Sequence, residues 1–300
     1  MKPIRWKAQT RRNVHAYLFM LPWLIGFVAF VIVPFASTLW HSFHQEIRTP
    51  SGVGTAWTWT GLDNWSYALS TDLILRTEIL PNYLRFLAFR FPLIQVYALF
   101  CALLLNRKFA GRGFFRAVFF VPVLIFSSSV YKVLQDNGGF AYPLYQMQLP
   151  DLVERLLFRQ GEFAHVFGVV VGTTVDIMIT SGVQILVFLA ALQGIPSSLY
   201  EAARVDGCTE WEGFWKITLP MVSPFILLNV IFTLIESLTA PWNTLPQYII
   251  ELVVSGRFRD SLDMGYASAV ACLFFGIVLA MVLAALGLGR RFVFYAEERR

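Results

Sequence analysis

Few residues of this sequence have the types and spacing that catalysis or metal binding requires. The glycine-containing stretch 168–174 lacks the lysine that a phosphate-binding loop uses to hold nucleotide phosphates. His41 and His44 form a pair, but no third ligand accompanies them, and no serine, histidine and aspartate grouping is evident. We therefore expect no catalytic residue, no metal site and no cofactor in this chain.

Charged side chains within apolar segments are a second group that could do chemistry. Arg90, Asp176 and Glu236 fall within or near the outer halves of three such segments. A charge at bilayer depth costs roughly 2.5–3.5 kcal/mol or more unless it faces protein or water. Two interpretations remain open: an ion pair that holds helices together, or the polar lining of an internal cavity.

The segment 193–219 is a polar interruption between two strongly apolar segments. Ser198 and Glu201 have the spacing of a capping box, and Thr209 and Glu212 repeat it. Ala202 and Ala203 favour a helix and leave its surface open to close approach, while Gly207 is suited to end it. The pattern predicts a helix, a glycine corner and a second short helix.

Two surfaces could receive this polar segment. An amphipathic hairpin at the membrane interface would be anchored by Trp211 and Trp215. However, the segment carries four acidic residues against only Arg204 and Lys216, and an anionic inner leaflet attracts the reverse composition. The charge balance favours a protein partner.

The elements that position these residues are predicted to be transmembrane helices. The chain is 57% hydrophobic and only 14% charged, and a helix needs about 20 apolar residues to cross a hydrocarbon layer of about 30 Å. Six apolar segments satisfy this, at 16–41, 82–105, 114–134, 166–192, 220–242 and 265–289. They do not alternate as barrel strands would. The expected fold is an all-α membrane protein with six transmembrane helices.

The flanking charges predict the orientation of these helices. Residues 1–15, 106–116, 193–219 and 290–300 hold most of the Lys and Arg, whereas most acids lie in the opposite loops. By the positive-inside rule, both termini and the polar segment 193–219 are expected to be cytoplasmic. Because the basic residues flank the spans and form no separate domain, a nucleic-acid partner is not expected.

The chain also divides into regions along its length. Residues 1–81 would form the cytoplasmic N-terminus, the first transmembrane helix and an external loop. Residues 82–290 would form a five-helix core that includes the cytoplasmic loop 193–219, and residues 291–300 a cytoplasmic tail.

Several motifs together resemble one family. The loop reads EAA at 201–203, Gly207, Phe214 and ITLP at 217–220. Further motifs agree with it: AYLFMLP at 16–22, GLDNW at 61–65, LNRK at 105–108, GRGFFR at 111–116, FFVP at 119–122, FLAALQ at 188–193 and GYASA at 265–269. This set resembles the EAA-loop permease subunits of binding-protein-dependent ABC importers, most closely the carbohydrate type related to maltose and glycerol-3-phosphate permeases.

The resemblance implies a role for each position of the loop. The helix with Glu201, Ala202 and Ala203 would be the coupling helix, seated in a cleft of a cytoplasmic ATPase subunit where Glu201 meets a basic group. Arg204 and Asp206 would orient the loop, and Gly207 would make its corner. Helices two to six would form the translocation core, with the first helix peripheral.

The resemblance also implies partners and a substrate class. The expected assembly has a second, similar permease chain, two ATPase subunits and an extracytoplasmic solute-binding protein, in the bilayer of a prokaryotic cytoplasmic (inner) membrane. The expected substrate is carbohydrate-like. Since sugars are bound through hydrogen bonds and aromatic stacking, the candidates for the substrate pathway are Arg90, Asp176, Gln184, Asn229, Glu236, Trp242 and Asn243.

A different class of protein remains as the alternative. An ion-coupled secondary transporter would use intramembrane carboxylates such as Asp176 and Glu236. Many such folds are built from internal repeats, and none is visible in this chain. Uptake that depends on ATP and resists proton uncouplers would separate the two classes.

Overall fold

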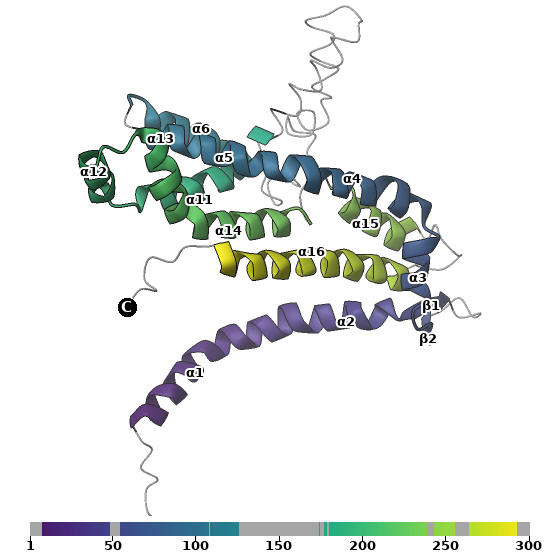
Figure 1. Ribbon diagram of the computed structural model, residues 1–300. Coiled ribbons are helices and arrows are strands. Elements are labelled where there is room, and N and C mark those ends of the chain that lie inside the picture. The colour runs from purple at the N-terminus through teal and green to yellow at the C-terminus, as the bar shows by residue number, and fades with distance from the viewer. Residues whose placement is uncertain are drawn as a thin grey trace, which may run out of the picture. The chain divides into compact units, whose positions relative to one another are not determined.

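A computed structural model describes residues 8–48, 55–107, 109–125, 180–238, 243–255 and 264–292, with residues 174, 177 and 178. It divides into two compact units, the first formed by residues 1–77 and 244–277 and the second by residues 78–243 and 278–300. Figure 1 labels the helices and strands that follow. Helices dominate both units, as the sequence predicts.

The first unit contains the N-terminal helices and a small sheet. Its elements are α1 (Ala8–Phe27), η1 (Val28–Ile32), α2 (Val33–Ser42), β1 (His44–Arg48), β2 (Thr55–Trp59), α3 (Asp63–Ser70), α15 (Leu245–Ser255) and the first part of α16 (Met264–Phe292). The π-helical turn η2 (Leu75–Ile79) crosses into the second unit.

The second unit contains the helices that carry the polar loop. Its elements are α4 (Leu80–Arg85), η3 (Phe86–Arg90), α5 (Phe91–Asn106), α6 (Arg112–Ile125), α11 (Gly182–Gln193), α12 (Ser197–Val205), α13 (Glu210–Gly213), η4 (Phe214–Thr218), α14 (Leu219–Glu236) and the end of α16.

The hairpin of β1 and β2 corrects the expectation of an all-α fold. The two strands pair antiparallel, with His44 opposite Trp59 and Glu46 opposite Trp57. Residues 55–59 read Thr-Ala-Trp-Thr-Trp, and threonine and tryptophan both favour an extended strand. The rings of His41 and Trp57 stack with centroids 4.4 Å apart, which attaches the hairpin to the end of α2.

Within the described residues, four helical segments are long and apolar enough to cross a membrane: Tyr17–Ser42, Leu75–Asn106, Glu210–Glu236 and Met264–Arg290. A fifth is counted if α11 and α12, bent by 61°, form one broken span. These segments contain or overlap four of the predicted spans. Residues 126–134 and most of 166–179 lie outside the described residues, so six spans and cytoplasmic termini stay predictions.

The apolar helices contain π-helical turns whose cause is visible in the sequence. In the described part of the chain, η1, η2, η3 and η4 come before Pro34, Pro81, Pro92 and Pro220, each two residues after the turn. A proline has no N–H and its ring displaces the carbonyl of the preceding turn. In the wider turn, a carbonyl accepts from the N–H five residues later. The Leu219 N–H, for example, donates to the Phe214 carbonyl.

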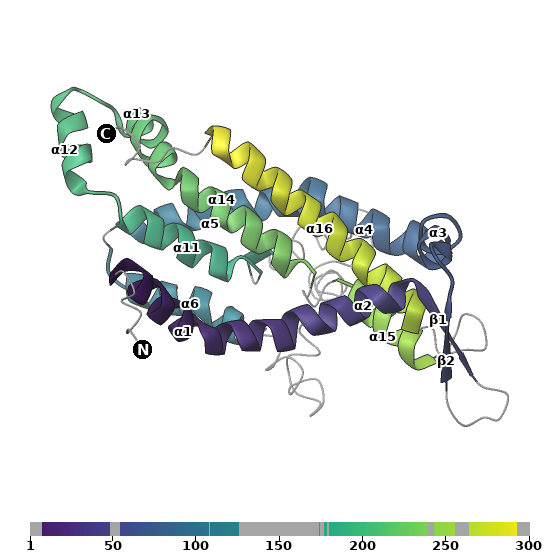
Figure 2. The ribbon, with the colours of Figure 1, turned by 90° about the horizontal axis from the view of Figure 1, so that it is seen from below.

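Three helices form the core of the second unit. Figures 1 and 2 show α5, α11 and α14 lying side by side, and buried side chains fill the space between them, among them Ala98, Ala102, Phe188 and Val222. The alanines let the helix backbones approach closely, as is common where transmembrane helices pack. This packing fixes the positions of α11 and α14, the two helices that the polar loop connects.

One glycine makes a close contact that a larger residue would break. A Cβ atom at Gly265 would lie 1.9 Å from the His44 carbonyl oxygen, whereas one at Gly276, also in α16, would meet nothing within 4 Å. We predict that Gly265→Ala lowers stability by about 1–3 kcal/mol, the usual cost of overpacking, and that Gly276→Ala does not. Thermal unfolding of the purified variants measures this, and equal unfolding midpoints for the two would contradict it.

Candidate functional site

The helix α12 is the most exposed element of the polar loop. Figure 1 shows that α12 turns away from α11. The bend between the two helices is 61°, and none of the side chains of α12 is buried. Glu201, Ala202 and Arg204 are exposed and Ala203 is half-buried. No hydrogen bond or ion pair joins the side chain of Glu201 to another described residue, so its carboxylate is available to a partner.

The predicted capping box at the start of α12 is wrong. The helix begins at Ser197 with Pro196 as its N-cap, in an extended conformation and without a side-chain cap. Ser198 therefore lies inside the first turn, where its hydroxyl does not cap the helix. The proline decides the start because its ring fixes φ near the value that a helix entrance requires.

The end of α12 confirms the predicted glycine corner. Gly207 has φ of 75°, a left-handed conformation that other residues adopt at a cost. The Cys208 N–H donates to the Ala203 carbonyl at 2.9 Å, and the Gly207 N–H donates to the Arg204 carbonyl at 3.1 Å. These bonds close the helix in the manner of a Schellman motif.

The second predicted capping box is confirmed at the start of α13. The Thr209 hydroxyl accepts from the Glu212 N–H at 3.3 Å, and Glu212 accepts in return from the Thr209 N–H at 3.0 Å. Lys216 lies 3.2 Å from the other carboxylate oxygen of Glu212. The local sequence thus determines the shape of the loop on both sides of Gly207.

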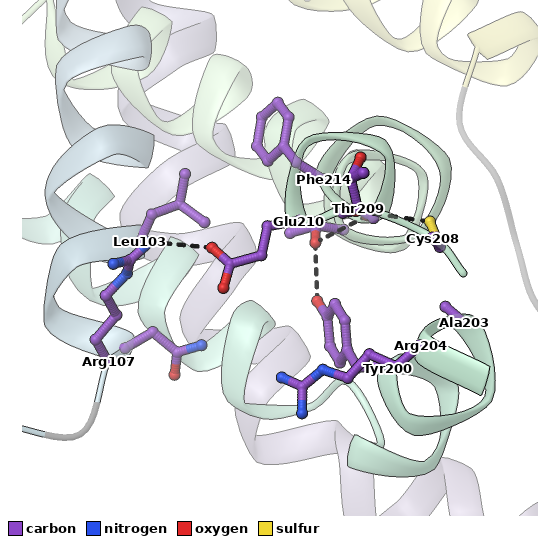
Figure 3. A pocket seen from close by; sticks show the side chains of 12 residues that line it. Leu103, Arg107, Tyr200, Ala203, Arg204, Cys208, Thr209, Glu210 and Phe214 are labelled. Atoms are coloured by element: carbon purple, nitrogen blue, oxygen red, sulfur yellow. Dashed lines mark hydrogen bonds and ion pairs between the residues drawn. The ribbon is translucent and has the colours of Figure 1, made fainter. Parts of the chain in front are cut away.

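A hydrogen bond that the sequence did not predict ties α12 to the next helix. The hydroxyls of Tyr200 and Thr218 are 2.8 Å apart, and Thr218 donates to the Gly213 carbonyl, so Tyr200 is the donor. Figure 3 shows this bond beside a pocket between α5 and the loop. Tyr200 and Ala203 share one half-buried helix face. That burial is known only from the structure, so no sequence pattern identifies Tyr200.

Three of the predicted pathway residues lie together in a buried polar layer. Gln184 on α11 and Asn229 on α14 are fully buried, and the Gln184 amide donates to Glu236 at 3.0 Å. It also donates to the Thr233 hydroxyl at 3.1 Å. Asn229 donates to the backbone carbonyl of Gln184 at 3.1 Å. Hydrogen bonds therefore link α11 to α14 inside the apolar core.

Two further members of this layer, Thr233 and Gln95, are not among the predicted pathway residues. Thr233 is buried, and Gln95 on α5 donates to its hydroxyl at 2.9 Å. Polar residues at positions 229, 233 and 236 of an otherwise apolar helix share one face, a spacing that would have revealed Thr233. Gln95 stands alone among apolar neighbours and gives no such periodic signal.

The other pathway candidates are not all in this layer. Arg90 is half-buried in η3, at the end of the π-helical turn that precedes α5. Asn243 is buried and donates to the Ser237 carbonyl at 2.9 Å. Asp176 and Trp242 lie outside the described residues.

The first unit contains a buried carboxylate that the sequence analysis did not single out. Asp72 accepts hydrogen bonds from the hydroxyls of Tyr248 on α15 and Tyr266 on α16, and from the Leu75 N–H at 3.0 Å. Burial, reinforced by the Asp72 carboxylate, raises the pKa of Tyr248 above its ordinary value. The phenol therefore stays protonated and keeps donating, which holds α15 in place.

The apolar spans define this protein as a multi-pass α-helical membrane protein. The family model for the inner membrane component of binding-protein-dependent transport systems matches residues 95–289, more than half of the chain. The chain belongs to that family.

Its relatives agree with this assignment. The chain is 29% identical to the probable ABC transporter permease protein YesP of Bacillus subtilis (strain 168), over 89% of this chain and 87% of the relative. It is 27% identical to the trehalose/maltose transport system permease protein MalF of Thermococcus litoralis, over 95% and 96% of the two chains.

Solved structures share the fold. A bacterial ABC transporter that imports the acidic polysaccharide alginate matches with a TM-score of 0.58 at 21% identity, over 94% of this chain and 96% of that one. A second structure of the alginate transporter, in complex with an alginate pentasaccharide-bound periplasmic protein, gives a TM-score of 0.59 at 20% identity.

The Tyr200 hydroxyl provides a test of how the loop is held. We predict that Tyr200→Phe loosens α12, because it removes a bond worth about 1 kcal/mol, and that the amides of 197–206 then exchange faster with deuterium. Ser198→Ala is the matched control, since its hydroxyl does not cap the helix. Faster exchange in Ser198→Ala, or unchanged exchange in Tyr200→Phe, would show that the loop is held differently.

Proposed function

We propose that this chain is the permease subunit of an ATP-driven importer and forms half of the translocation pathway for a carbohydrate-like solute. Its family is that of binding-protein-dependent transport components, and the named relatives include sugar permeases. Membership of this family does not favour the alternative of an ion-coupled secondary transporter. The single observation that carries the proposed mechanism is the exposed helix α12.

Helix α12 is proposed as the coupling helix. An ATPase subunit receives its exposed face, with Glu201 paired to a basic group there. The small side chains of the exposed Ala202 and of the half-buried Ala203 allow close approach. Arg204 and Asp206 flank the contact, and Gly207 makes the corner that returns the chain to the membrane. ATP and Mg²⁺ are bound and ATP is hydrolysed in the ATPase subunits, not in this chain.

The contacts of α12 explain how a displacement would spread. It is joined through residues 194–196 to α11, and through α13, η4 and the bond between Tyr200 and Thr218 to α14. Because α11 and α14 pack together around a shared core, both move with α12. ATP-driven closure of the ATPases would thus shift rigid helices between outward and inward access.

The polar layer is proposed as part of the substrate pathway. The side-chain oxygens of Gln95, Gln184 and Asn229 are buried without a hydrogen-bond donor among the described residues. A buried acceptor without a donor costs about 1–3 kcal/mol, so these oxygens suit a solute that donates many hydrogen bonds, such as a sugar. The remaining candidates for the same pathway are Arg90, Asp176, Glu236, Trp242 and Asn243.

The proposed assembly follows from the family. Two permease chains enclose the pathway, two ATPase subunits bind on the cytoplasmic side, and an extracytoplasmic solute-binding protein delivers the substrate. Both termini of this chain face the cytoplasm of a prokaryotic cell, and the protein resides in its cytoplasmic (inner) membrane. The solved alginate transporter bound to its periplasmic protein supports a binding-protein partner by analogy of fold.

The coupling role is tested at Glu201. We predict that Glu201→Lys lowers ATP-dependent uptake by proteoliposomes of the reconstituted complex more than tenfold, since breaking a hydrogen-bonded charge pair at an interface costs about 2–5 kcal/mol. Glu78→Gln is the control, because this exposed carboxylate lies in η2, away from the loop. If Glu201→Lys transports like the wild type, α12 is not the coupling helix.

The pathway role is tested at Gln95 and Glu236. We predict that Gln95→Leu and Glu236→Ala lower transport more than they lower assembly of the complex, because solute contacts are lost while the packing of α5, α11 and α14 persists. Val96→Ala, on the exposed face of α5, is the control for a general effect on the helix. If transport and assembly fall in parallel, the layer holds helices together and does not line the pathway.

A further inference from the structure

The pocket between α5 and the polar loop has the size of a ligand site. Its volume is about 570 Å³, and its walls come from the end of α5, from α12 and from the segment that joins α12 to η4 (Figure 3). Small-molecule sites typically measure roughly 300–1,000 Å³. All the lining residues belong to the second compact unit, so the pocket is formed within one packed body.

Two guanidinium groups from different elements border this pocket. Arg107 follows α5 and Arg204 lies on α12, while Glu210 is the one carboxylate in the lining. Figure 3 shows Arg204 on one wall and the pair of Arg107 and Glu210 on another. The lining therefore carries two positive charges against one negative charge.

The cations of the pocket are available to a ligand. Arg107 and Glu210 are 3.7 Å apart, with side chains 76% and 92% exposed, and such exposed pairs contribute little. Among the described residues, no hydrogen bond or ion pair engages the guanidinium group of Arg204. A phosphate offers each guanidinium two parallel hydrogen bonds and binds it more strongly than a loose carboxylate contact does.

The depth of the pocket in the membrane also favours a phosphate group. The apolar segment Leu75–Asn106 ends at the pocket, and the apolar part of α14 begins at Leu219, just after the lining residue Thr218. With the polar loop on the cytoplasmic side, a placement that rests on the proposed function, the pocket lies at the level of the inner-leaflet headgroups.

We propose that this pocket binds a phosphate-bearing anion through Arg107 and Arg204. The phosphate comes either from the headgroup of an anionic lipid or from a soluble phosphorylated molecule. Bound there, it links the end of α5 to α12 in place of the weak contact between Arg107 and Glu210. It thereby adds a tether to the same helix that the ATPase is proposed to grip, so coupling depends on what occupies the pocket.

Cys208 makes the proposal testable without a transport assay. It lines the pocket and is half-buried, whereas Cys101 and Cys272, the other cysteines of the chain, are buried. The probe is the rate at which N-ethylmaleimide labels Cys208 in the full-length chain, measured by mass spectrometry of its peptide. Labelling is compared in phosphatidylcholine vesicles, in the same vesicles with inorganic phosphate, and in vesicles of equal parts phosphatidylcholine and phosphatidylglycerol.

The expected result is slower labelling with a phosphate source. At saturation, with ligand about ten times above its dissociation constant, labelling slows about tenfold because it follows the free fraction. Protection by inorganic phosphate identifies a soluble anion as a sufficient ligand, and protection only by phosphatidylglycerol identifies the lipid. Potassium chloride at matched ionic strength should give no protection.

Variants separate binding in the pocket from a general charge effect. Arg107→Gln should abolish protection and Arg107→Lys should weaken it, provided that both label like the wild type without phosphate. Lys216→Gln, in the same loop but outside the pocket, should retain it. Absence of protection from every phosphate source, equal protection by chloride, or full protection in Arg107→Gln would each overturn the proposal. None of these outcomes depends on uptake by the Glu201 variants. The labelling test can therefore contradict the phosphate site without contradicting the proposed function, and the uptake test can do the reverse.

Discussion

The packing of α11 against α14 is the constraint on which the rest of the structure depends. The polar loop between them contains no buried helix of its own, and its exposed helix α12 would have no fixed position if the two helices were free to separate. Alanines, a buried phenylalanine and the hydrogen bonds among Gln184, Asn229 and Thr233 hold them together. A surface helix can transmit a displacement only because its two ends are fastened to one packed body.

Sequence reasoning succeeded where the physics is local. The corner at Gly207 and the cap formed by Thr209 and Glu212 depend on residues within a few positions of each other, and both are as predicted. The long apolar segments were also identifiable, because a lipid-crossing helix satisfies its backbone hydrogen bonds internally. The failure at Ser198 is instructive, since a neighbouring proline set the start of the helix before the serine could cap it.

Most of the missed features are contacts between residues that are not neighbours in the chain. The partner of Tyr200 is Thr218, and that of Gln95 is Thr233, more than a hundred residues away. Asp72 accepts hydrogen bonds from the hydroxyls of Tyr248 and Tyr266, which are also more than a hundred residues away. Each residue type is common in isolation, so only the tertiary arrangement shows which of them meet. The hairpin at 44–59 was overlooked for a simpler reason: it is short and lies in what the apolar pattern defined as a loop.

The wide turn η4 has a consequence for which side of α14 faces its neighbours. One additional residue in a helical turn rotates every later side chain by about 100° relative to a regular α-helix, since 3.6 residues complete a turn. η4 lies immediately before α14, so it sets the rotation of that whole helix about its own axis. The direction in which Asn229 and Thr233 point is thus decided some ten residues earlier, by the turn that accommodates Pro220.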